Sequence, residues 1–470
     1  MKHALRGALI LAMSCAALAA AGTSPTATPK LLAAPDILTL DEAEESALEH
    51  NASIRASRAA LDASVWESRK SWMAFLPAGS FTSSVTRVDE NSYERANQAV
   101  GGLEQMFEAL GISGVEIEPF LYRNTYRNSL TVNQQFPLNV NLLGQRGLAG
   151  AGLRASRAGH EASRSELIFA VRQAYFGVLA AREMHEVARE SVSSAENRLS
   201  LARDKEELGM LPRSDVLRWE TTLAEAKSGE LAAANGVRLA EMELNRLLGR
   251  AFDAPLALER VGERSLSSAL ELAAIDPEEL AGRIGSESPS ARAIQAGSDA
   301  AAAGKTLALS GITPSLHFSL SYGWQDNDTV EFDGDRTWSA TALVTLPVFD
   351  LMGNYASWRK AAADQRRAEY ESADALDHLR LGAWASWLEV VRAREDLAFR
   401  ESAERQARET FEEMESRYEA GQVAEFDLVD VQVGLTAARA QAVASRYDYY
   451  AALAALESLA GEFLTMEETR

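Results

Sequence analysis

The segment GMLPRSDVLRWETTLAEA, at residues 209–226, recurs in altered form as GQVAEFDLVDVQVGLTAA at residues 421–438. Each version starts with a glycine and carries an aspartate six residues later, Asp215 in the first and Asp427 in the second. The shift that carries Gly209 onto Gly421 also carries Arg182 onto Arg394 in the stretch upstream. Because an internal repeat dictates the architecture of a chain, the pair indicates two similar halves with the same order of elements.

The starts of the two halves also resemble each other. SIRASRAALDA begins at Ser53 and SARAIQAGSDA at Ser290, which is a larger shift than the one between the two glycines. The difference places roughly 25 extra residues in the first half, between Pro77 and Pro137. A variable segment at 251–286 joins the halves.

The first residues have the pattern of a secretory signal. Lys2 and Arg6 precede an apolar stretch at 8–18, and the small residues at 19–21 suit cleavage. The alternative is a lipoprotein attached through Cys15, but the residues before this cysteine match a lipidation signal poorly. We expect this division of the chain: a signal peptide at 1–21, a first structural repeat at 22–250, an inter-repeat segment at 251–286 and a second structural repeat at 287–465.

A heptad seam indicates very long helices. Apolar residues recur from Leu167 in alternating steps of four and three, and residues 149–208 contain no proline. One helix of about 60 residues would be about 90 Å long, which is too long for a compact domain. The predicted seam consists of Leu167, Val171, Ala174, Val178, Ala181, His185, Ala188, Val192, Ala195, Leu199 and Ala202.

Other segments alternate apolar and small polar residues, the pattern of strands. They lie at 126–136, 315–324 and 337–346, with a weaker candidate at 78–87. A soluble, half-buried sheet would show the same alternation, but the signal peptide and the long helices favour a membrane barrel. The residues predicted to face lipid are Leu130, Val132, Leu316, Phe318, Leu320, Ala342 and Val344.

Four strands cannot close a barrel with a usable lumen, and lipid does not tolerate an open sheet edge. We therefore expect a homotrimer with a twelve-stranded barrel, continued by a tube of helices. Apart from the signal, no apolar run reaches the roughly 20 residues that a membrane-spanning helix needs.

The composition disfavours several other classes of protein. A net charge of −21 argues against binding nucleic acid, and 47% hydrophobic with 24% charged residues is typical of a folded chain. The six histidines show no paired ligand spacing, and no phosphate-binding loop or nucleophile motif is present. We therefore predict no catalytic residues, no metal site and no cofactor; the protein is not expected to be an enzyme.

From Leu38 to about Gly461 the chain resembles the TolC-type outer-membrane efflux protein family, the outer-membrane factors. The match rests on LTLDEAEESALEHNASIRASRAAL from Leu38, AYFGVLAARE from Ala174, the FPL and LPV turns at Phe136 and Leu346, and the duplicated glycine–aspartate segments. The resemblance implies a trimeric β-barrel in the outer membrane and an α-barrel in the periplasm. Such proteins are passive exit ducts for tripartite efflux pumps or type I secretion systems.

The same resemblance implies the partners, a periplasmic adaptor protein and an inner-membrane transporter besides outer-membrane lipid. A competing hypothesis is a structural or adhesive scaffold that spans the periplasm without conducting.

The resemblance places the duplicated segments at helix-to-helix turns that form the periplasmic tip and contact the adaptor. Gly209 and Gly421 suit such turns because glycine readily adopts the left-handed conformation that ends a helix. Asp427 and Asp430 fall where the family rings its aperture with carboxylates, and their i,i+3 spacing puts both on one helical face. Taken alone, the pair would be read as solvated residues at a helix start.

The resemblance also implies a latch that holds the tip closed. Asp215 occupies the equivalent position of the first repeat, and Tyr418 lies where a tyrosine can join the latch. Val423 departs from the family pattern, in which some members have a basic residue there, so Arg213 or Arg218 are possible substitutes.

The extra residues of the first half form an insertion at about 88–123. Val100, Leu103, Phe107 and Leu110 have helical spacing, which predicts a short amphipathic helix in an external cap. A mobile loop is the alternative.

Overall fold

The computed structural model describes residues 37–112, 114, 117–136, 140–261, 266–327, 335–346, 348–420 and 422–461. The predicted signal peptide, Cys15 and Gly421 lie outside the described residues. Residues 37–39 and 255–259 belong to a small unit of their own, in which Leu38 and Leu258 form a parallel bridge. Within the described residues, the helices and strands given below belong to the second unit.

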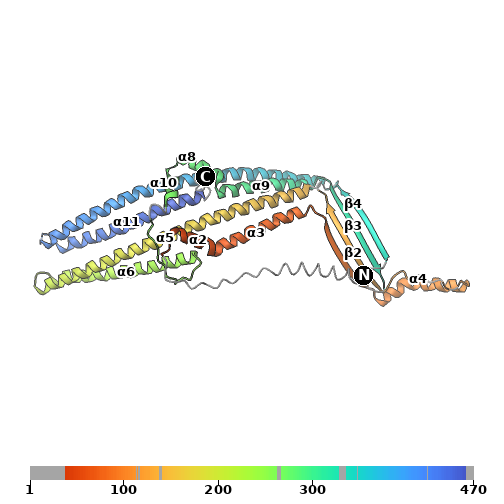
Figure 1. Ribbon diagram of the computed structural model, residues 1–470, viewed down its shortest axis with the longest axis horizontal. Coiled ribbons are helices and arrows are strands. Elements are labelled where there is room, and N and C mark those ends of the chain that lie inside the picture. Colours follow the sequence, from red (N-terminus) through yellow and green to blue (C-terminus); the bar gives the residue numbers. More distant parts are fainter. Residues whose placement is uncertain are drawn as a thin grey trace. The chain divides into compact units, whose positions relative to one another are not determined.

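Two long helical pairs repeat the same design (Figure 1). In the first half α5 (Val140–Glu207) is followed by α6 (Arg213–Leu247), and in the second half α10 (Leu351–Glu419) is followed by α11 (Glu425–Ala460). The second helix of each pair starts four residues after the glycine of its sequence repeat, so the structural repeat matches the sequence repeat. At 68 residues, α5 is about 100 Å long.

The predicted long helix is confirmed, although it starts nine residues before the expected Ala149. Most of the heptad seam is buried, because α5 packs against α3, α6, α9 and α11. The buried members of the seam are Leu167, Val171, Val178, Val192, Ala195, Leu199 and Ala202.

Shorter helices complete the helical part. Asn51 separates two of them: its side chain accepts a hydrogen bond from Ser53 N (2.8 Å) and donates one to Leu247 O (2.8 Å), which ties the start of α3 to the end of α6. These helices are α2 (Leu40–His50), α3 (Ala52–Met73), α7 (Ser267–Ala274), α8 (Pro277–Glu287) and α9 (Pro289–Leu309). Among the described helices, none has the length and hydropathy needed to cross a bilayer.

The four predicted strands form one antiparallel sheet in the order β1–β2–β3–β4. Its members are β1 (Ala78–Arg87), β2 (Asn124–Gln135), β3 (Ser315–Asp326) and β4 (Asp335–Thr345). The fold class is thus confirmed as mainly α with a four-stranded sheet.

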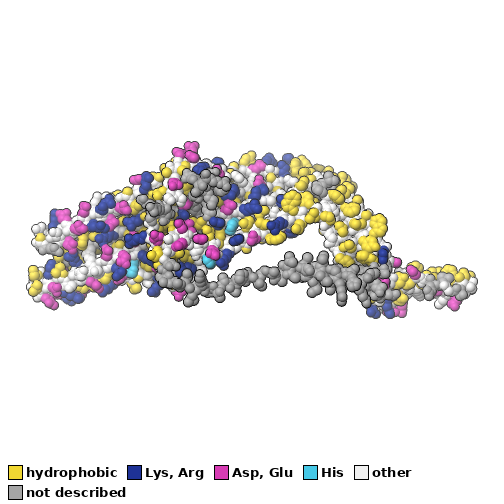
Figure 2. Space-filling view, viewed as in Figure 1, with side chains coloured by type: hydrophobic (Ala, Val, Ile, Leu, Met, Phe, Trp, Pro, Cys, Tyr) yellow, Lys and Arg dark blue, Asp and Glu magenta, His cyan; other side chains and the backbone are white. Residues whose placement is uncertain are grey.

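The register of the ladders gathers the apolar residues on one face. Leu320 lies between Val132 and Ala340, so the even-numbered residues of β2, β3 and β4 share a side. Phe81 pairs with Leu130, so the odd-numbered residues of β1 join that side. Figure 2 shows the resulting concentration of hydrophobic side chains over the sheet.

The insertion between β1 and β2 contains α4 (Glu90–Ala109), so its predicted helix is confirmed. Asp89 caps the helix by accepting a hydrogen bond from Ser92 N (3.0 Å). The strands continue up to the insertion, because Val88 N donates to Arg123 O (3.0 Å).

Candidate functional site

The turn between α5 and α6 is closed by a glycine. Gly209 has φ +68°, and a Cβ at this position would meet nothing within 4 Å, so the backbone conformation and not the available space favours glycine. Gly209 N donates to Glu206 O (2.8 Å) and Met210 N donates to Lys205 O (2.8 Å). This pair of bonds is a Schellman motif, which satisfies carbonyls at the end of α5.

The turn between α10 and α11 has equivalents of one of these two bonds and of the first bond of the following helix. Gln422 N donates to Arg417 O (2.9 Å), which corresponds to the bond from Met210. Asp427 N donates to Ala424 O (3.1 Å), just as Asp215 N donates to Pro212 O (3.0 Å). The two turns therefore share their backbone geometry at the start of the second helix.

The two aperture candidates lie at the start of α11. Asp427 and Asp430 are exposed, whereas Leu428 between them is fully buried. Val429 packs against an apolar cluster that holds α5 and α6 together near their turn. The buried members of this cluster are Leu199, Ala202, Val216 and Trp219.

Tyr418 is buried at the end of α10, where it contacts a residue that the sequence did not suggest. Lys205 Nζ donates to the Tyr418 hydroxyl (3.1 Å) and lies 4.3 Å from the centre of its ring. The contact joins α5 to α10 immediately before the two turns. A basic residue four positions before Gly209 is the only sign of it in the sequence.

The remaining latch candidates have other contacts within the chain. The half-buried Asp215 accepts a hydrogen bond from Ser214 Oγ (3.4 Å). Arg213 pairs with Glu206 (3.3 Å), and the guanidinium of Arg218 lies 5.1 Å from the ring centre of Phe426. The structure thus brings Lys205, rather than either arginine, to the Tyr418 hydroxyl.

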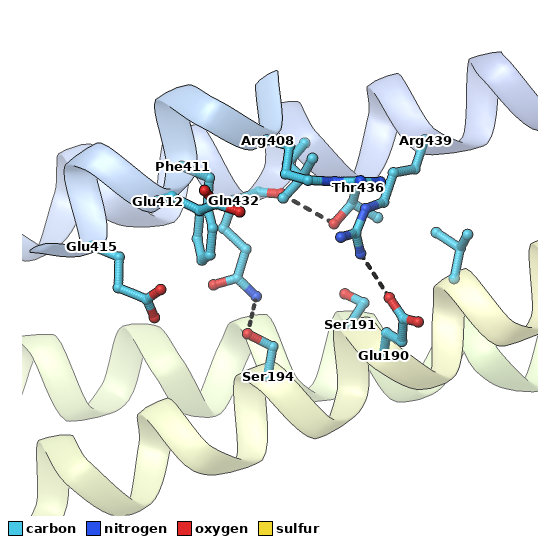
Figure 3. A pocket seen from close by; sticks show the side chains of 12 residues that line it. Glu190, Ser191, Ser194, Arg408, Phe411, Glu412, Glu415, Gln432, Thr436 and Arg439 are labelled. Atoms are coloured by element: carbon cyan, nitrogen blue, oxygen red, sulfur yellow. Dashed lines mark hydrogen bonds and ion pairs between the residues drawn. The ribbon is translucent and has the colours of Figure 1, made fainter. Parts of the chain in front are cut away.

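Farther along the helices from the turns, polar contacts link α11 to α5 (Figure 3). Gln432 Nε2 donates to Ser194 Oγ (2.8 Å), and Arg439 pairs with Glu190 (2.6 Å). A groove of about 250 Å³ lies between these helices and α10. Further along the seam, Glu183 accepts hydrogen bonds from Arg446 (3.2 Å) and from the Tyr447 hydroxyl (2.9 Å).

A nearly buried charge cluster joins α2, α5, α7 and α11. Arg172 Nε donates to Glu44 (2.6 Å), and the same guanidinium pairs with Glu457, which also accepts from Ser268 Oγ (2.9 Å). Burial raises the pKa of the Glu44 carboxyl, and the hydrogen bond from Arg172 opposes this rise. The described residues include no group of three His, Cys, Asp or Glu side chains placed to hold a metal ion.

Solved structures share this fold at low sequence identity. A membrane protein from Pseudomonas aeruginosa is 18% identical with a TM-score of 0.74, over 90% of this chain and 93% of that chain. The MtrE outer membrane channel of Neisseria gonorrhoeae, solved in its open state, is 19% identical with a TM-score of 0.71, over 90% and 89%. The CmeC outer membrane channel of Campylobacter jejuni is 15% identical with a TM-score of 0.70, over 90% and 85%.

No curated protein matches the chain by sequence. The family model of the outer membrane efflux proteins matches residues 44–250 and 280–462, and it therefore covers most of both halves. The chain belongs to the outer membrane efflux protein family.

Proposed function

We propose that three copies of this outer-membrane efflux protein form the exit duct of a tripartite efflux pump or a type I secretion system, gated at the helix turns. The observation that carries the proposal is the four-stranded sheet, which has one apolar face and two unpaired edges. In the described part of the chain, β1 and β4 each have a single neighbouring strand.

Closure of the sheet requires other copies. The backbone groups of an unpaired edge have no partner in hydrocarbon, so a lone sheet of this kind is unstable in a membrane. Every neighbouring pair is antiparallel, so β1 and β4 run in opposite directions. The β1 strand of one copy therefore suits antiparallel pairing with β4 of the next, and three copies make a closed barrel of twelve strands.

The second face of the sheet suits a water-filled lumen. It consists mainly of small hydroxyl and amide side chains, which favours a conduit over a solid anchor. Residues on this face include Ser80, Thr82, Ser129, Thr131, Asn133, Ser319, Ser321, Ser339 and Thr341.

The gate is proposed to lie at the two turns, where the adaptor of the pump would also dock. Asp427 and Asp430 are exposed within the first two turns of α11, so three copies would contribute six carboxylates to one ring. Charge at that density attracts cations and binds multivalent ones. The contact between Lys205 and Tyr418 holds α10 against α5 behind this ring.

Planar-bilayer recordings test the gate. Replacing both aspartates, Asp427→Ala with Asp430→Ala, should lower cation selectivity and weaken block by multivalent cations, because the ring loses its charge. Thermal stability should hardly change, since both side chains are exposed.

Asp374→Ala with Asp377→Ala is the matched control, because these exposed carboxylates have the same spacing in the middle of α10. Equal selectivity in the parent and in the Asp427/Asp430 variant would refute the aperture. A trimer that never conducts would favour the alternative, a structural or adhesive scaffold that spans the periplasm.

A further inference from the structure

Helix α4 is fastened along one side to the segment that returns to β2. Arg123 pairs with Glu90 and lies 5.9 Å from the ring centre of Tyr93. The Asn97 side chain donates to Leu121 O (2.7 Å) and accepts from Leu121 N (3.1 Å). These contacts attach α4 to the end of the β1–β2 hairpin. They lie on the side of α4 that buries Val100.

A second face of α4, next to the one that buries Val100, is apolar and exposed. Ala99, Leu103, Met106 and Leu110 follow one another in steps of four, three and four, and we call them the α4 stripe. The exposed fractions of the last three are 38%, 47% and 66%, whereas Val100 on the fastened side is only 6% exposed. The stripe thus has the spacing of a helix-packing seam but no covering partner among the described residues.

The acidic residues of α4 avoid this stripe. In a heptad with the stripe at positions a and d, the charged residues nearest the seam would be at e and g, but every acid falls at b or f. The carboxylates of neighbouring copies would therefore point away from a shared seam. The acids are Glu90, Glu94, Glu104 and Glu108.

Two observations identify the occupant of the stripe. The helix carries four glutamates and one arginine, a net charge of 1 − 4 = −3, which disfavours anionic lipid headgroups. It also begins three residues after Arg87, the last residue of the unpaired edge strand β1. The helix that carries the stripe therefore follows directly after the edge strand that the trimer is proposed to pair.

We propose that the α4 stripe packs against the α4 stripes of neighbouring copies, forming a collar of three helices at this end of the barrel. The inference rests on the proposed trimeric duct and adds to it a second contact between copies. The collar would narrow the outer end of the duct and stiffen the end of the hairpin at which it starts.

Cysteine crosslinking in intact outer membranes tests the collar. The chain has one cysteine, Cys15, which lies in the predicted signal peptide, so an introduced cysteine would be the only one in the mature protein. Leu103→Cys should give several-fold more covalent dimer than Gln105→Cys after oxidation or treatment with a short bismaleimide, because only position 103 faces the seam. Met106→Cys is a second seam variant, which guards against poor export of the first.

Sedimentation of the same variants in detergent separates the two proposals. A trimer in which neither Leu103→Cys nor Met106→Cys crosslinks above the Gln105→Cys level overturns the collar and leaves the duct intact. A trimer in which a fluorophore at position 103 is quenched by brominated lipid also overturns it, because the stripe then contacts membrane. Monomers that do not crosslink contradict the trimeric duct together with the collar.

Discussion

A single lysine accounts for the best-defined contact near the turns. Lys205→Met should raise the open probability more than Tyr418→Phe, because it removes the hydrogen bond and the cation–π contact, whereas the phenylalanine variant keeps the ring. From typical values for a charged hydrogen bond and a cation–π contact, the lysine variant should shift the closed-to-open equilibrium by about 1–3 kcal/mol per copy. Single-channel recording measures both variants beside the parent.

Lys227→Met provides the control for this lysine. Lys227 on α6 pairs with Glu196 on α5 (2.9 Å), so this variant removes an equal charge without touching Tyr418. If both lysine variants changed the open probability equally, the loss of positive charge and not the Tyr418 contact would be responsible.

The charge cluster around Arg172 predicts a pH dependence. The raised pKa of Glu44 means that its contribution to stability is fully present below its ordinary pKa and is lost as the pH rises through the raised value. Arg172→Met leaves Glu44 and Glu457 unpaired at 15% and 14% exposure, which should cost about 3 kcal/mol at neutral pH. The cost should be smaller at about pH 5 than at about pH 8, because protonation of Glu44, whose pKa is raised, removes its unpaired charge.

Melting curves followed by circular dichroism measure this difference. Arg392→Met is the control: it breaks an exposed pair with Glu389, and such pairs contribute less than about 1 kcal/mol. A pH-independent loss in the Arg172 variant would show that lost packing, and not unpaired carboxylates, destabilises it.

The residues near the two turns differ in how far the sequence alone points to them. Asp427 and Asp430 were selected from the sequence repeat together with the resemblance to the family, and their role at an aperture stays a prediction. Lys205 was not, because it meets Tyr418 only when two helices far apart in the chain pack together. No local periodicity records which face of α10 lies against α5.

At the scale of elements, the strands were predicted well because their period of two persists over ten residues or more. The start of α5 was placed too late for a physical reason. Gly144 weakens an isolated helix, yet a Cβ there would lie 2.6 Å from Leu307 Cα, so the glycine lets α5 approach α9 closely. Tertiary packing therefore extends this helix beyond what its own sequence favours.

The register of the sheet predicts opposite tolerance at adjacent positions of β3. Leu320→Arg should cost roughly 2–4 kcal/mol near the bilayer midplane, because Leu320 lies among Val132 and Ala340 on the apolar face. Ser319→Arg should cost much less, because it points to the other face, between Asn133 and Thr341. Chemical unfolding from lipid vesicles measures both variants, and equal costs would mean that the faces are assigned to the wrong sides.

At the scale of the whole molecule, the two helical pairs are held in different ways. The α5–α6 pair has an apolar cluster near its turn, which α11 contacts through Val429, whereas Gln432, Arg439 and Tyr447 of α11 reach α5 through polar or charged contacts. Water can replace polar contacts at little cost, but not apolar packing. We therefore expect any opening at the turns to move α10 and α11 together against α5 and α6.

The last prediction concerns the closure of the barrel. It depends on which N–H groups of β1 point toward β2 and which point toward the open edge. Val88 N donates to Arg123 O, so the register makes even-numbered residues of β1 point their N–H groups to β2 and odd-numbered residues point theirs to the open edge. Proline lacks an N–H and is tolerated at a free edge but not within a ladder. Ser83→Pro should therefore leave the sheet of one copy intact and abolish the trimer, whereas Ser84→Pro should disturb the sheet itself. Sedimentation and circular dichroism of both variants measure the two effects; a stable Ser83→Pro trimer would show that β1 is not paired with another copy.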